Sequence, residues 1–184
     1  MKTLESNIAK NFLAGFLLVG SVTFATAQTN VKTDTTNKAI AEAAVQVQTQ
    51  SQQDNPTILG LKKQIEANPQ DTQALANLAT AYQDVQNWNG SLETWMKIST
   101  LLTDWAPSYY SHGYVYQNMK DNGNAKTAYE KYISRVQPEE WEASKKNLAY
   151  AHFFVAHSYA QTDKAKAKQH ISKSLELDGK RRSS

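Results

Sequence analysis

The chain has 184 residues, a formal net charge of +3 and no cysteine. This length suits one ordinary domain, and so small a charge gives no argument for a nucleic-acid partner. The lack of cysteine excludes disulfides, a lipoprotein anchor and a C-x-x-C-H haem site, so stability must come from apolar packing.

The first 27 residues have the pattern of a secretory signal peptide. Lys2 and Lys10 precede an apolar run over residues 12–24, and residues 25–27 (Ala-Thr-Ala) offer a cleavage site. The run has thirteen residues, whereas about 20 are needed to cross a bilayer. We therefore expect residues 1–27 to be removed from an exported protein, periplasmic or secreted. An uncleaved membrane anchor is the alternative.

Residues 28–55 are mostly Gln, Thr, Asn and Ala and contain no aromatic residue. Such a segment cannot bury enough apolar surface to offset its ordering entropy, which predicts a disordered tether. Within it, residues 40–47 form a short helix-like pattern that is alternatively a docking segment. The next segment differs: Ile58, Leu61 and Ile65 share one helical face, and Pro69 follows them. This predicts a capping helix that starts at Pro56.

A set of five residues then recurs at a spacing of thirty-four: Ala79, Tyr82, Ser91, Trp95 and Ile98 correspond to Gly113, Tyr116, Ala125, Tyr129 and Tyr132. A fixed period of this length indicates helical hairpins that bury their apolar faces by stacking on one another. Asp71, Asn87 and Asp121 are placed to cap the helices of these hairpins, and Pro107 suits a first helical turn.

The third unit departs from this spacing. Residues 138–141 (Pro-Glu-Glu-Trp) open a helix that meets no breaker before Gln161, and Tyr159 lies forty-three residues after Tyr116. Asp163 is the predicted cap of a last helix, which Gly179 ends.

The repeated residues resemble the tetratricopeptide repeat (TPR) family over residues 56–178. The resemblance implies an all-α solenoid of about three helical hairpins with an amino-terminal capping helix, followed by a basic tail at residues 179–184. His112 stands where the family usually has leucine. Residues 65–71 with the following apolar positions are similar to periplasmic TPR modules of cytochrome c maturation, a possibility within the same class.

In this family the first helices line a concave groove that binds protein segments. The groove residues that the resemblance implies here are Ala76, Thr80, Gln83, Tyr110, Tyr114, Gln117, Phe153 and His157. The carboxylate-binding clamp of some relatives is absent, because its positions hold uncharged residues: Ala76, Thr80, Ser111, Tyr150 and Phe154. Tyr110 and Tyr114 are four apart on one helical face, which predicts an aromatic pair facing the groove, unless the third repeat or the tether covers it.

No catalytic or cofactor motif is recognisable, so we expect neither an enzyme nor a cofactor. His152 and His157 lie about 140° apart around a helix and do not converge on a metal. Lys164, Lys166, Lys168 and Lys173 make the last helix basic, which indicates either a weak contact with an anionic surface or an ordinary solvated face.

The sequence therefore predicts a non-catalytic adaptor of the cell envelope that binds a protein segment in its groove. A self-associating solenoid of uncertain oligomeric state and a glycan- or cell-wall-binding module are the alternatives.

Cleavage after Ala27 is directly testable. Amino-terminal sequencing of the protein purified from the exported fraction is expected to begin at Gln28, because the small residues at 25 and 27 fit the signal-peptidase site. An intact Met1 on protein recovered from the membrane fraction would contradict the prediction.

Overall fold

The computed structural model describes residues 55–179 and contains, within them, seven α-helices and one short 3₁₀ helix. The predicted signal peptide, nearly all of the predicted tether and nearly all of the basic tail lie outside these residues. The α-helices are α3 (Pro56–Ala67), α4 (Thr72–Asp84), α5 (Trp88–Leu101), α6 (Ala106–Asn118), α7 (Asn122–Arg135), α8 (Trp141–Tyr159) and α9 (Lys164–Asp178), and the 3₁₀ helix η1 (Pro138–Glu140) comes directly before α8. None of the helices between residues 55 and 179 has the length and apolar character needed to cross a membrane.

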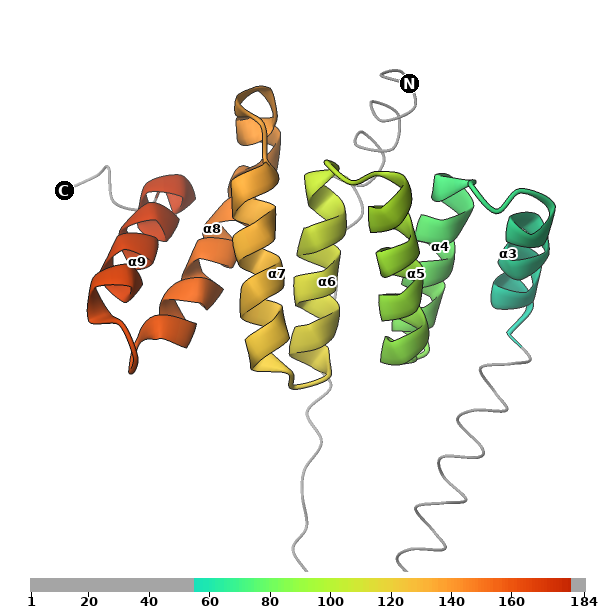
Figure 1. The fold of residues 1–184 in the computed structure, drawn as a ribbon, viewed down its shortest axis with the longest axis horizontal. Helices are drawn as coiled ribbons and strands as arrows, with labels where there is room; N and C mark the ends of the chain where they lie inside the picture. The colour runs from blue at the N-terminus through green and yellow to red at the C-terminus, as the bar shows by residue number, and fades with distance from the viewer. Residues whose placement is uncertain (1–54, 180–184) are drawn as a thin grey trace, which may run out of the picture.

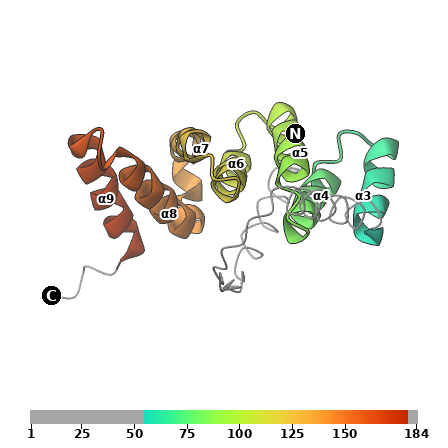
Figure 2. The same cartoon turned by 90° about the horizontal axis from the view of Figure 1, so that it is seen from below.

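The helices form three hairpins, α4–α5, α6–α7 and α8–α9, which stand in a row with α3 at one end (Figure 1). The first helices α4, α6 and α8 lie along one side of the row, and α5, α7 and α9 lie along the other (Figure 2). We call the first side the first-helix face. The predicted all-α solenoid of three hairpins with an amino-terminal helix is confirmed.

Asn55 caps the start of α3, and the side-chain caps that the sequence predicts fix where four further helices begin. Asp71, Asn87, Asp121 and Asp163 each accept a hydrogen bond from the backbone N–H three residues later, at 2.9, 2.9, 3.1 and 3.0 Å respectively. These bonds satisfy donors that a helix start otherwise leaves unpaired. They also stabilise the charged carboxylate, which lowers the pKa of Asp71 and of Asp121. All four predicted caps are confirmed.

The third hairpin has the longer first helix that the sequence predicts. Helix α8 has 19 residues, whereas α4 and α6 have 13 each. Its start is preceded by η1, in which Gln137 and Glu140 form a capping box. Helix α9 ends at Asp178 and is followed by Gly179, whose φ of 68° lies in the left-handed region that glycine enters without strain.

Large aromatic residues of the second helices fill the centre of the array. Trp95 of α5 and Tyr129 of α7 are both 0% exposed. A Cβ atom on Gly113 of α6 would lie 2.7 Å from the Tyr129 ring, closer than real contacts allow. Gly113 is therefore the residue that lets α6 approach α7 closely enough to enclose this ring.

Replacing Trp95 is expected to unfold much of the array. Truncation of a buried aromatic residue costs about 3–5 kcal/mol, out of a total stability of about 5–15 kcal/mol for a domain. The measurement is thermal unfolding of Trp95→Ala followed by circular dichroism. The neighbouring Met96→Ala is the control, because Met96 is 43% exposed and its loss is expected to change stability by only about 0.5 kcal/mol. Equal melting temperatures for the two variants would contradict the central position of Trp95.

Candidate functional site

The structure shows that one predicted groove residue is not at the surface. Ala76 of α4 is 0% exposed and belongs to the same buried cluster as Trp105 and Val115. The prediction that Ala76 lines the groove is wrong, because the first helix of the next repeat, α6, packs over this position.

The other groove residues of the first repeat offer polar surface. Thr80 is exposed, and its hydroxyl donates a hydrogen bond to the Ala76 carbonyl at 3.0 Å. Gln83 is half-buried and donates through Nε2 to the Ser91 hydroxyl at 3.1 Å. This end of the first-helix face therefore presents few apolar contacts to a partner.

Tyr110 and Tyr114 of the second repeat are half-buried rather than free anchors. The Tyr110 ring makes edge contacts with Tyr129 and Tyr132, at centroid distances of 5.5 and 5.2 Å. Tyr114 meets Trp88 edge-on at 6.3 Å and packs against the core cluster of the first hairpin. Burial is the main cause that raises the pKa of Tyr110. We therefore expect truncation of this pair to cost stability, which the sequence alone does not indicate.

Tyr150 of α8 covers part of this aromatic cluster. Its ring lies 6.4 Å from Tyr110 and 5.8 Å from Tyr129. Its hydroxyl donates to Oε1 of Gln117 at 2.9 Å, and the Tyr129 hydroxyl donates to the same oxygen at 3.2 Å. Gln117, a predicted groove residue, is thus held in place by two tyrosines. The third repeat covers the aromatic pair in part, through a residue that the predicted groove set does not contain.

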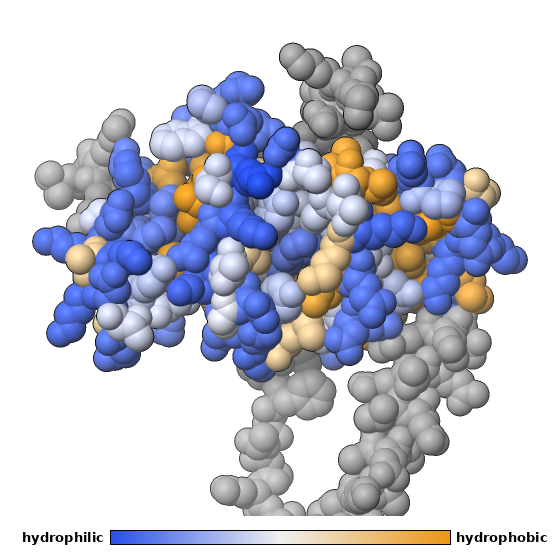
Figure 3. All heavy atoms as spheres, in the orientation of Figure 1, coloured by the Kyte–Doolittle hydropathy of each residue, from blue (hydrophilic) through white to orange (hydrophobic). Residues whose placement is uncertain are grey.

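Exposed apolar surface is concentrated on α8. Phe153 is 51% exposed, Tyr150 is 37% exposed, and Trp141 at the start of the helix is also exposed. His157, one turn after Phe153, is exposed as well. The side of the molecule on which α5, α7 and α9 lie in front is mostly hydrophilic, with apolar residues in separate patches (Figure 3). The α8 end of the first-helix face is therefore the surface best suited to an apolar contact.

Two histidines form a pair that the sequence analysis misses. Nδ1 of His152 on α8 lies 3.0 Å from Nδ1 of His170 on α9, and the His170 ring stacks on Tyr159. One nitrogen of the pair must carry the hydrogen and the other must be bare, so at most one ring can be charged. The two histidines are eighteen residues apart and lie on different helices, so no local sequence pattern indicates that they form a pair.

The surroundings of this pair favour neutral rings. Burial, followed by the neighbouring His170 and Lys173, lowers the pKa of His152 to about 4. Burial also lowers the pKa of His170, where the nearby Lys166 acts in the same direction and Glu130 in the opposite one. Between residues 55 and 179 no group of three histidine, aspartate or glutamate side chains gathers in a way that could hold a metal ion.

These observations define the class of protein: a stack of helical hairpins with a partly apolar face and no assembled reaction centre among the described residues. Residues 106–135, which form α6 and α7, match the family model of the tetratricopeptide repeat. The chain therefore contains a tetratricopeptide repeat, and repeats of this kind are in general non-catalytic protein-interaction modules.

Solved structures agree with this assignment. A crystal structure of MamA protein is 25% identical, with a TM-score of 0.53, and the match covers 67% of this chain and 63% of that one. The carboxyl-terminal part of a TPR repeat-containing protein from Cytophaga hutchinsonii is 23% identical, with a TM-score of 0.62, over 74% of this chain and 55% of that one. The chain thus spans less than two thirds of either structure. The comparison with curated proteins gives no match.

The histidine pair predicts a loss of stability in mild acid. Both rings bind protons less readily in the folded chain than in the unfolded chain, where the pKa of histidine is about 6.5. The unfolded state therefore takes up more protons as the pH falls below about 6.5, and the free energy of unfolding decreases from pH 7.5 towards pH 4.

The check is thermal unfolding of the wild type and of a His152→Asn, His170→Asn variant at pH 7.5 and pH 5.0. The wild type is expected to lose more melting temperature between the two pH values than the variant does. His112, whose pKa is also lowered by burial, is unchanged in both proteins and so does not affect the difference. An equal loss in both would show that the pair does not carry the effect.

Proposed function

We propose that the protein is an exported, non-catalytic scaffold that binds a segment of another protein along its first-helix face. The tetratricopeptide repeat at residues 106–135 supports the scaffold role, since such repeats generally bind protein partners. The signal-peptide pattern of residues 1–27 supports a place outside the cytoplasm, in the periplasm or beyond the cell.

The observation that best supports binding along the first-helix face is the concentration of exposed aromatic residues on α8. Tyr150 and Phe153 expose large apolar rings on the first-helix face, and tyrosine and phenylalanine are enriched at protein interfaces. Thr80 and His157 lie exposed on the first helices of the first and third repeats, so a bound segment that follows this face would pass both of them.

Site-specific photo-crosslinking tests the proposal. A photoreactive p-benzoylphenylalanine is introduced into the full chain at Thr80 or at His157, and at Thr127 on α7 as the matched control. All three side chains are exposed, so the substitution is expected to leave the fold intact. We expect adducts with a shared envelope protein from the first two positions and none with that protein from Thr127. Adducts of equal yield from all three positions, or from Thr127 alone, would contradict binding along the first-helix face.

A further inference from the structure

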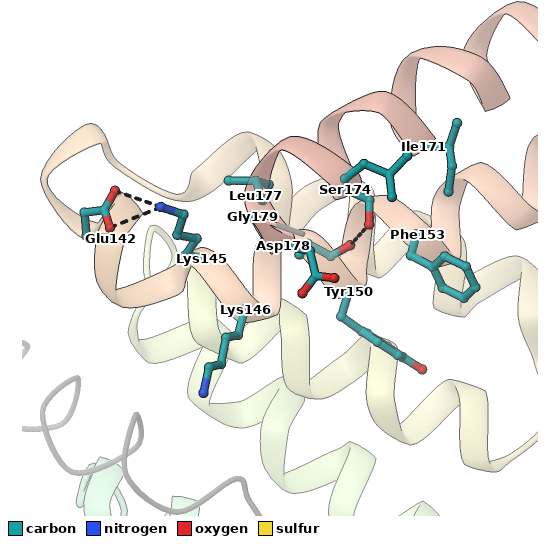
Figure 4. A pocket seen from close by; sticks show the side chains of 12 residues that line it. Glu142, Lys145, Lys146, Tyr150, Phe153, Ile171, Ser174, Leu177, Asp178 and Gly179 are labelled. Carbon is teal, nitrogen blue, oxygen red and sulfur yellow. Dashed lines mark hydrogen bonds and ion pairs between the residues drawn. The ribbon is translucent and has the colours of Figure 1, made fainter. Parts of the chain in front are cut away.

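The last hairpin contains a pocket whose lining includes only one of the predicted groove residues, Phe153. It lies between α8 and α9, has a volume of about 780 Å³, and is lined by both helices (Figure 4). Phe153, Ile171 and Leu175 give it apolar walls, and Lys146 lies towards its other end. The Ser174 hydroxyl is turned away from the space, because it donates to the Ala149 carbonyl at 2.8 Å.

Comparison with the second hairpin shows which surface of that hairpin is equivalent to this pocket. In the second hairpin, Tyr110, Tyr129 and Tyr132 form the surface on which α8 packs. The cap of each second helix fixes the register, so that Ile171 and Ser174 of α9 stand where α7 has Tyr129 and Tyr132. Phe153 stands forty-three residues after Tyr110, the same offset that separates Tyr159 from Tyr116.

The equivalent surface of the first hairpin is also covered by a helix. Ala76, Trp95 and Ile98 occupy these positions there, and all three are fully buried together with Val115 of α6. In the last hairpin Phe153 is instead 51% exposed. The pocket is therefore the position at which the array receives a first helix, and no helix within residues 55–179 fills it.

We propose that this pocket is the docking site for one amphipathic helix of a partner protein, which places aromatic side chains four residues apart against Phe153, Ile171 and Ser174 and a carboxylate near Lys146. The proposal deepens the proposed function and rests on it, since it names the kind of segment that the scaffold binds. The site itself lies at the α9 end of the array, not along the whole first-helix face.

The dimensions of the pocket fit a helix. Its lining on α8 runs from Glu142 to Phe153, which at 1.5 Å per residue is about 17 Å, or three helical turns. The two equivalent surfaces inside the array both hold helices. Apolar grooves between helices bind amphipathic helices in the same way.

The aromatic character of the partner follows from the size of the residues in the pocket. Ile171 and Ser174 are smaller than the Tyr129 and Tyr132 that stand at their positions one repeat earlier. The helix that packs on those tyrosines, α8, does so with Tyr150 and Phe154, four residues apart. A helix that fills the roomier final pocket needs side chains at least as large.

The charged residues that line the pocket, Glu142, Lys145, Lys146 and Asp178, cancel in formal charge, and Lys146 is the one to which we assign a contact with the partner. Lys145 is paired with Glu142 at 3.4 Å, whereas no carboxylate in the described part of the chain forms an ion pair with Lys146. A carboxylate on the incoming helix would meet Lys146 at the rim.

Apart from α8, the helices between residues 55 and 179 do not match that description. Residues 28–54, which include the helix-like segment 40–47, contain no aromatic residue, and α3 lies at the opposite end of the row (Figure 1). In a second copy, the exposed large apolar residues outside α8 stand singly: Leu59 on α3, Met96 on α5 and Met119 directly after α6. None of the described helices other than α8 therefore offers an exposed aromatic pair.

A peptide with the chemistry of α8 is the probe. A fluorescent peptide of residues 139–161 carries Tyr150, Phe154 and three glutamates, and its binding to the full chain is measured by fluorescence anisotropy. We expect saturable binding, weakened at least about tenfold by Phe153→Ala in the protein, as for an aromatic anchor. Met96→Ala, which removes an exposed apolar side chain from α5, is expected to have no effect.

Two further arms test the stated chemistry. A peptide with Tyr150→Ala and Phe154→Ala is expected to bind at least about tenfold more weakly, and Lys146→Glu in the protein is expected to weaken binding severalfold. Circular dichroism of each protein variant confirms that it is folded, and Phe153→Leu provides a milder change if Phe153→Ala is not folded.

No saturable binding to the folded wild type, or binding that Phe153→Ala leaves unchanged, would overturn the proposal. A dimer in light scattering that Phe153→Ala converts to a monomer would also overturn it, because the occupant would then be a second copy. Neither Thr80 nor His157 lines the pocket, so the crosslinking result and the peptide result can fail independently of each other.

Discussion

Each of the first two hairpins of this protein depends on the helix that follows it. The second helices carry one large residue eight positions after their caps, Trp95 in α5 and Tyr129 in α7, and both are fully buried. The partner helix of the same hairpin encloses part of each ring, as Gly113 does for Tyr129, and the first helix of the next hairpin closes the remainder. Stability is therefore distributed between neighbours, as expected for a solenoid, and no single unit has a complete core of its own.

This dependence explains which surfaces are buried and which are open. Ala76 and Tyr110 occupy equivalent positions of their repeats. Ala76 is fully buried in a cluster that includes Val115 of α6, whereas Tyr110 is partly covered by Tyr150 of α8. Phe153, the third member of that set, has no following helix among the described residues and stays exposed. The concentration of apolar surface on α8 is thus a consequence of its place in the array, and it is the reason that both proposed interactions involve the same end of the molecule.

The features that can be predicted from the sequence are those that depend on residues only a few positions apart. The caps at Asp71, Asn87, Asp121 and Asp163 need only a side chain and a backbone N–H three positions later. The period of thirty-four residues then gives the hairpins and their order. By contrast, the exposure of a groove position depends on the helix of another repeat, so Ala76 is misplaced. Two other contacts depend on side-chain rotamers of residues on different helices, which the residue spacing does not determine. They are the pairing of His152 with His170 and the hydrogen bonds of two tyrosine hydroxyls to Gln117.

The longer α8 gives the molecule a direction. Its six additional residues relative to α4 and α6 add about 9 Å of helix, and they carry an exposed tryptophan, Trp141, at the tip. The opposite end of the row is a single short helix, α3, that carries no aromatic residue. Because the two ends differ in both shape and chemistry, a long ligand lying against the array cannot be turned end for end without exchanging aromatic contacts for polar ones. A segment that binds along the first-helix face as proposed would therefore have one preferred orientation.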